Sequence, residues 1–174
     1  ANAALALLVT EGAKYEVEKL RRSYDKTFDT WQAHINLLWP LVPAELARER
    51  LEMLTEKLQE FSTFNVHLIR LTHAQTKKEG CKNLYIHFEI ETEPADMAVK
   101  LQDICAELYP EAERRPLHLT VGQVDEETAL RLEEKYNSLP IAKQLTFSAT
   151  SVTLLTRKSS GAAMKPTSRV YLQC

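Results

Sequence analysis

The sequence predicts an α+β protein of two intimate lobes, each of which contributes one strand with a polar face. Apolar residues that alternate with polar ones predict strands, and apolar residues at every third or fourth position predict helices between them. The order is strand, helix, motif strand, helix, hairpin, helix, motif strand, helix and strands, which indicates an approximate internal duplication. With 174 residues the chain can bury a full core as one domain covering residues 1–174.

The first half of the chain predicts three strands and two helices. Its motif strand, residues 31–39, stops where Pro40 and Pro43 remove backbone donors. The other predicted elements are a strand over residues 5–9, a helix with its apolar face at Val17, Leu20 and Tyr24, a helix from Ala44 with its face at Leu51, Leu54, Leu58 and Phe61, and a strand over residues 64–71.

The second half predicts the other motif strand at residues 116–121, after a charged loop at 111–115. Asp125, with Thr128 three positions on, is typical of a helix N-cap. Before this strand, the sequence predicts a polar turn at 75–80, a return strand at 84–90, and a helix after Glu93-Pro94 with its apolar face at Met97, Leu101, Ile104, Cys105 and Leu108. After it, the sequence predicts a helix with its apolar face at Ala129, Leu132, Tyr136 and Leu139. Two strands, at 145–156 and 169–172, are expected to end the chain, with a mobile basic loop between them.

Composition narrows the possible partners. A net charge of -2 gives no general attraction to polyanions, so we expect no extended nucleic-acid surface, although a small site could still bind one phosphate. Three separated cysteines without a CxxC pattern are typical of reduced thiols in a cytoplasmic or nuclear protein. The apolar run at residues 3–9 is too short to span a membrane and lacks the features of a signal peptide. We expect a monomer.

The two motif strands carry the residues that indicate chemistry. Because side chains two apart on a strand share a face, His34 lies beside Asn36, and His118 lies beside Thr120. Two imidazoles that face one cleft can exchange protons at neutral pH. The opposite, apolar faces are expected to hold Trp31, Ala33, Ile35, Leu37 and Trp39 in the first strand, and Leu117, Leu119 and Val121 in the second.

The strings His34-Ile35-Asn36-Leu37 and His118-Leu119-Thr120-Val121 resemble the paired His-x-Ser/Thr-x motifs of the 2H phosphoesterase superfamily, which includes the 2′-5′ RNA ligase-like cyclic phosphodiesterases. The flanks and the motif spacing also match, closest to a eukaryotic branch. The resemblance implies a bilobal fold of two antiparallel sheets with outer helices, related by a pseudo-twofold axis around a central cleft. Asn36 departs from the family, where Thr or Ser is more common.

The resemblance implies metal-independent hydrolysis of a 2′,3′-cyclic phosphate, on an RNA 3′ end or a nucleotide, to a 2′-phosphate. His34 and His118 are the expected general acid and base, in an order that the sequence leaves open. Asn36 and Thr120 are expected to donate hydrogen bonds to the phosphate oxygens. Trp39 and Tyr171 are candidates for stacking on the base. No metal ligands and no cofactor are expected.

Other polar residues carry weaker signals. Arg157, Lys158 and Lys165 form a basic group that could bind a further phosphate of an RNA end, or could simply be solvated. The remaining histidines, His67, His73 and His87, have no comparable neighbours in sequence, and His73 and His87 are expected at the surface.

Two other functions stay open at this point. Asn36 is compatible with a module that binds nucleotides or RNA ends without hydrolysing them. The two motifs are also compatible with a phosphodiesterase for 2′-5′ oligoadenylate or for ADP-ribose cyclic phosphate.

Overall fold

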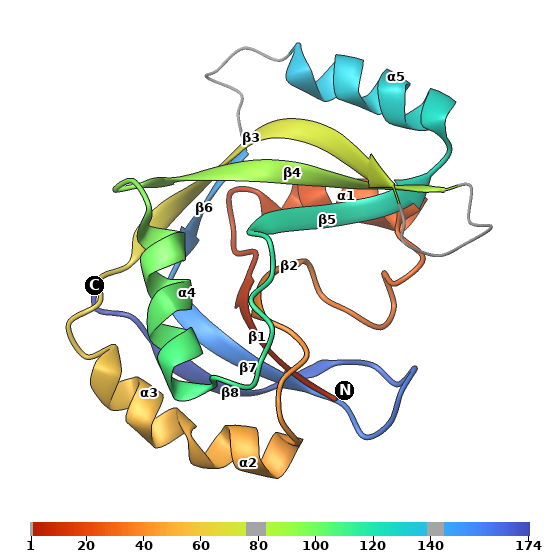
Figure 1. Ribbon diagram of the computed structural model, residues 1–174. Coiled ribbons are helices and arrows are strands. Elements are labelled where there is room, and N and C mark those ends of the chain that lie inside the picture. Colours follow the sequence, from red (N-terminus) through yellow and green to blue (C-terminus); the bar gives the residue numbers. More distant parts are fainter. Residues whose placement is uncertain (1, 76–82, 139–144) are drawn as a thin grey trace.

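The computed structural model describes residues 2–75, 83–138 and 145–174, which form two four-stranded antiparallel sheets with helices around them (Figure 1). The α+β class and the two sheets predicted above are therefore confirmed. The first sheet has the strand order β2 (His34–Leu38), β1 (Ala3–Leu8), β7 (Ser151–Thr156), β8 (Lys165–Tyr171). The second has the order β5 (His118–Val124), β4 (Leu84–Glu93), β3 (Phe64–Gln75), β6 (Leu145–Ala149).

Each motif strand, β2 or β5, forms one edge of its sheet, and the two edges contact each other. The helices are α1 (Lys14–Tyr24), α2 (Ala44–Glu49), α3 (Leu51–Lys57), α4 (Met97–Leu108) and α5 (Glu126–Asn137). Helix α5 covers β3, α1 lies against β5 and α4 lies against β2 (Figure 1). Asp125 caps α5 as predicted, because its side chain accepts a hydrogen bond from the backbone N–H of Thr128 (2.8 Å).

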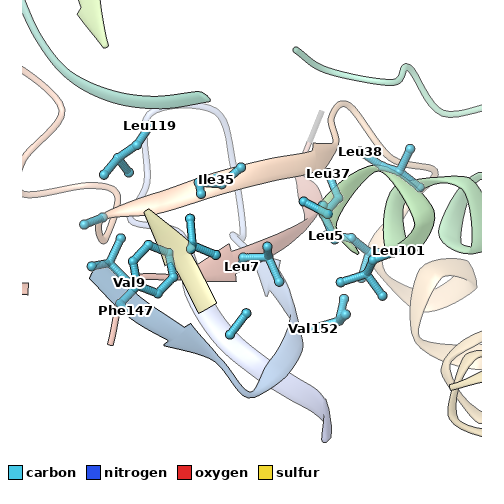
Figure 2. Packing of buried hydrophobic residues seen from close by; sticks show 14 of the residues in the cluster. Leu5, Leu7, Val9, Ile35, Leu37, Leu38, Leu101, Leu119, Phe147 and Val152 are labelled. Atoms are coloured by element: carbon cyan, nitrogen blue, oxygen red, sulfur yellow. The ribbon is translucent and has the colours of Figure 1, made fainter. Parts of the chain in front are cut away.

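One hydrophobic core spans both sheets. Leu5, Leu7 and Ile35 from the first sheet are fully buried and pack with Leu119 and Phe147 from the second (Figure 2). Burying each of these side chains contributes about 1.5–3 kcal/mol to folding. The alternation in the motif strands follows from this packing, since it turns Ile35 and Leu119 inward and their polar neighbours outward.

Two tryptophans do not follow the predicted alternation. Trp31 precedes β2, so strand geometry does not fix the side on which its ring lies. Trp31 and Trp39 pack against Ala4 and Ala6, which belong to a second buried cluster on the other side of the first sheet. The small alanine side chains leave room for the indole rings on that side.

The C-terminal third differs most from the sequence prediction. The run at 145–156 is not one strand: β6 ends at Ala149 in the second sheet, and β7 begins at Ser151 in the first. The first sheet therefore combines strands from both ends of the chain, and the two sheets do not correspond to successive halves. Strand β8 begins at Lys165, earlier than predicted, and buried Met164 with its N–H bonded to the carbonyl of Thr30 (2.7 Å) anchors the basic loop.

Other differences are local. The predicted helix after Ala44 is divided at Arg50 into α2 and α3. The hairpin strand β3 continues to Gln75, and the predicted turn that follows lies outside the described residues, as does Leu139. No helix in the described part of the chain is both long and apolar enough to cross a membrane.

Candidate functional site

The first motif strand presents His34 and Asn36 on the side of the first sheet away from the main core. Leu8 pairs with His34 across the β1–β2 ladder, and Ala6 pairs with Asn36, so these residues share that side. The ring of Trp31 stacks on the His34 imidazole, with 4.6 Å between ring centroids and 22° between planes. This stacking fixes the orientation of the imidazole from one side.

The hydrogen bond of His34 indicates its tautomer, and its surroundings determine its charge. Its Nδ1 lies 2.6 Å from the carbonyl oxygen of Gln32. A carbonyl oxygen only accepts, so Nδ1 carries the proton and Nε2 is left as the acceptor. Burial and, less strongly, the charge of Arg21 lower the pKa of His34, and they outweigh the Gln32 carbonyl and Asp25, which raise it, so that the pKa is about 4. The free protein therefore holds this imidazole neutral at pH 7.

The second motif strand presents His118 and Thr120 on the polar side of the second sheet. In the β4–β5 ladder Glu89 pairs with His118, and His87 pairs with Thr120. Burial and, to a smaller extent, electrostatic repulsion from His87, Arg115 and His34 together lower the pKa of His118 to about 4. Protonation of His34 would therefore disfavour protonation of His118 across the contact between β2 and β5.

His87 is the residue that the sequence reasoning missed. Its ring stacks on that of His118, with 4.3 Å between centroids and 24° between planes, and its Nε2 lies 2.9 Å from Thr72 Oγ1. Burial lowers its pKa. It was expected at the surface because it alternates outward on a hairpin strand. The signal that could have found it is the cross-strand pairing of this hairpin with the second motif.

Gln102 joins the two motif strands at one end. This buried side chain on α4 donates from Nε2 to the carbonyl oxygens of Leu37 (2.9 Å) and Arg115 (2.8 Å). The predicted charged loop is in fact paired with the end of β2, because Trp39 N–H bonds to the carbonyl of Glu113 and Arg115 N–H bonds to that of Leu37. The backbone that leads into His118 is thereby held against the first sheet.

A second network joins the strands at the other end. Arg21 and Asp25 form a buried ion pair (2.9 Å). Arg21 Nη2 donates a hydrogen bond to the carbonyl oxygen of Trp31, and Gln123 donates one to Asp25 Oδ1 (3.3 Å). The pair therefore connects the backbone before β2 with β5. Burial raises the pKa of Asp25, but hydrogen bonds from Thr27 and Arg21 outweigh it and leave that pKa below its usual range. The carboxylate therefore stays ionised.

Gly122 permits the close approach of α1 to β5. A Cβ at this position would lie 2.7 Å from Tyr24 Cβ and 3.0 Å from the backbone oxygen of Tyr24, closer than a side chain tolerates. The glycine after the second motif therefore has a packing role. It lets the end of α1 reach the network around Asp25.

A family comparison identifies the chain. The model of the 2′-5′ RNA ligase superfamily matches residues 9–161. The chain belongs to this superfamily of phosphoesterases. The eukaryotic branch expected from the motif flanks stays a prediction. No curated protein matches the sequence.

Several solved structures share the fold at low sequence identity. The protein TT0787 of Thermus thermophilus is 13% identical with a TM-score of 0.63, over 99% of this chain and 98% of that one. LigT of E. coli complexed with 3′-AMP is 14% identical with a TM-score of 0.61, over 98% and 97%. LigT complexed with ATP is 14% identical with a TM-score of 0.57, over 99% and 98%. These likenesses show the fold.

Within this superfamily fold, the predicted stacking residues lie at different places. Trp39 is close to the first motif, since its ring meets that of Trp31 edge to face at 5.2 Å, and the guanidinium of Arg157 lies over it at 5.5 Å. Tyr171 is exposed on β8, three strands from His34 and therefore about 14 Å away. The structure does not bring Tyr171 to the motif histidines.

The side chain of Asn36, the polar partner of His34 on the first motif strand, is not fully hydrogen-bonded. Its Oδ1 is buried and has no hydrogen-bond partner, and the same holds for Oγ1 of Thr153, two strands away in the same cross-strand row. An unpaired buried acceptor costs about 1–3 kcal/mol. Among the described residues, no group of three or more histidine, cysteine, aspartate or glutamate side chains is placed to hold a metal ion.

Proposed function

We propose that the protein hydrolyses 2′,3′-cyclic phosphates on RNA ends or nucleotides to 2′-phosphates, without a metal ion. The observation that carries this proposal is the pair of imidazoles, His34 and His118, on contacting edge strands of two sheets, where protonation of His34 lowers the pKa of His118. Two such groups supply the acid and the base that in-line displacement at phosphorus requires.

We assign His118 as the base and His34 as the acid. Burial lowers the pKa of His118, and the Arg115 guanidinium and any protonation of His87 or His34 disfavour its protonated form as well, so its imidazole is neutral and ready to accept a proton. His34 has groups that favour its protonated form, namely the Gln32 carbonyl and the Asp25 carboxylate. The negative charge of a bound phosphate raises the pKa of His34 from its low value in the free protein, so that the imidazole is protonated in the complex before it acts as the acid.

The reaction then balances as follows. His118 takes a proton from water while the water oxygen forms a bond to phosphorus, and the bond from phosphorus to the 3′ oxygen breaks. Nε2 of His34 gives its proton to that oxygen, while its Nδ1–H keeps the bond to the Gln32 carbonyl. Thr120 donates a hydrogen bond to a non-bridging oxygen, where charge accumulates. Asn36 donates through its amide, whose oxygen and nitrogen are interchangeable by rotation.

The test is turnover of 2′,3′-cyclic AMP by His34→Ala and His118→Ala. Each substitution removes one proton-transfer group, so kcat should fall roughly 10²–10⁴-fold. His67→Ala is the matched control, because His67 lies on β3 and bonds to Thr146 and Glu93 instead of the motif strands. Undiminished turnover in both motif variants would refute the assignment.

A second candidate is a module that holds nucleotides or RNA ends without hydrolysing them. It is favoured by Asn36, which replaces a hydroxyl donor with an amide whose buried oxygen is unpaired. Calorimetry with 3′-AMP, alongside the turnover assay, separates the two. Tight binding without turnover, together with activity gained on Asn36→Thr, supports the module, whereas turnover by the natural sequence excludes it.

A further inference from the structure

A basic cleft opens at the end of the first sheet where β1 begins and β7 ends. It encloses about 930 Å³ between α2, the end of β7 and the start of β8, which lie at the same end of the sheet in Figure 1. Its lining includes four cationic side chains, Arg48, Arg157, Lys158 and Lys165, and one carboxylate, Glu45. In a chain with a net charge of -2, this is a local concentration of positive charge.

Three of these cations are available to a ligand. In the part of the chain that the structure describes, Arg48, Lys158 and Lys165 are exposed and form no ion pair. Arg157 is held in place, since its Nε donates to Asn2 Oδ1 (3.2 Å). Unpaired cations around a concave surface are suited to phosphate groups, whose binding releases counterions.

The wall of the cleft between these cations is apolar. It is formed by Leu41, Pro43, Ala44, Ala162 and Ala163. An apolar surface makes no favourable contact with an inorganic anion, but it packs against the sugar and base of a nucleotide. The lining therefore suits a nucleic-acid strand better than a free ion.

A row of rings connects the basic cleft with His34 in the first motif. Trp31 stacks on His34, Trp39 meets Trp31 edge to face, and the guanidinium of Arg157 covers Trp39 from the cleft side. Aromatic and guanidinium surfaces of this kind bind bases without sequence preference.

The separation fits more than one nucleotide. Asn2, at the cleft, lies four residues along the chain from Ala6, which pairs with Asn36, and six residues from Leu8, which pairs with His34. The cleft is therefore about 14 Å from Asn36 and about 20 Å from His34. A stacked strand advances about 3.4 Å per nucleotide and an extended one more, so these distances correspond to roughly two to six nucleotides. A cyclic mononucleotide at the histidines cannot span them.

We propose that the basic cleft binds the phosphodiester backbone of an RNA strand whose 3′-terminal cyclic phosphate lies between His34 and His118. This inference rests on the proposed function and names its substrate class: oligonucleotides ending in a 2′,3′-cyclic phosphate are preferred to cyclic mononucleotides. Lys158 and Lys165 contact upstream phosphates, and the row of rings supports the bases between.

The test compares Lys158→Glu/Lys165→Glu with the control Lys57→Glu/Lys100→Glu. All four lysines are exposed, and both doubles change the net charge equally, but Lys57 and Lys100 lie on α3 and α4, outside the cleft lining. The first measurement is kcat/KM for a tetranucleotide relative to that for 2′,3′-cyclic AMP. The second is fluorescence anisotropy with a labelled tetranucleotide that ends in a 3′-phosphate, which requires no turnover.

Loss of two phosphate contacts should reduce oligonucleotide affinity roughly 25-fold at 0.1 M salt and should flatten the slope of log Kobs against log salt by about 1.4. The tetranucleotide-to-mononucleotide ratio should fall accordingly in the cleft variant and stay unchanged in the control. Equal affinity and an equal ratio in both variants would overturn the inference. If no cyclic phosphate is hydrolysed, the proposed function fails, and the anisotropy measurement still decides whether the cleft binds RNA.

Discussion

Lowering the pH should destabilise the protein through His34, and the structure gives the size of the effect. The pKa of this imidazole is about 4 in the folded protein, against about 6.5 in an unfolded chain. Between these values the unfolded chain binds a proton that the folded protein does not. The contribution to stability is therefore complete above about pH 6.5 and is lost as the pH falls toward 4.

The magnitude follows from the two pKa values. Between pH 8 and pH 5, His34 alone should account for about 2 kcal/mol of lost unfolding free energy. His34→Gln keeps a neutral polar side chain but cannot titrate, so the variant should lose about 2 kcal/mol less than the natural protein over the same range. Urea denaturation at pH 8 and pH 5 measures both. Parallel losses in the two proteins would show that His34 is not held neutral, and the reasoning about the site would fail with it.

Three further substitutions test the packing and the polar networks. Gly122→Ala should destabilise by about 1–3 kcal/mol in urea unfolding, because α1 lies too close to β5 for a methyl group. Arg21→Met leaves the Asp25 carboxylate buried without its partner and should cost about 3–5 kcal/mol, part of which Arg21→Met/Asp25→Asn should restore. His87→Phe keeps a stacked ring but one that cannot be protonated and so cannot repel a protonated His118; the pKa of His118, followed by its proton resonances in NMR, should therefore rise.

The motif strands could be predicted from sequence because their signals are local. Alternation alone puts His34 beside Asn36 and His118 beside Thr120, and the structure places each pair on one polar side. The same rule failed for Trp31, which lies outside the strand. Side chains alternate between the two faces of a sheet only within the paired strand, so the side on which a residue beyond its end lies does not follow from the alternation.

The place of His87 could not be predicted in the same way. Its stacking on His118 depends on the register between β4 and β5, and an irregularity between Ile86 and His87 shifts that register. Likewise, nothing local marks Thr150 as the point where the chain passes from one sheet to the other. Both features depend on which strands pair and in which register, and the alternation of apolar and polar residues within one strand does not contain that information.

The geometry of the site depends on residues outside both motifs. At one end, Gln102 ties the end of β2 to the backbone before β5 through two carbonyl oxygens. At the other, Arg21 and Asp25 tie the backbone before β2 to Gln123 near the end of β5. β2 and β5 share no ladder, so these side chains, together with the backbone hydrogen bonds between residues 113–115 and the end of β2, set the spacing of the two strands. The motif residues determine which chemistry is possible, and these two networks determine whether the imidazoles are held at the separation that the chemistry requires.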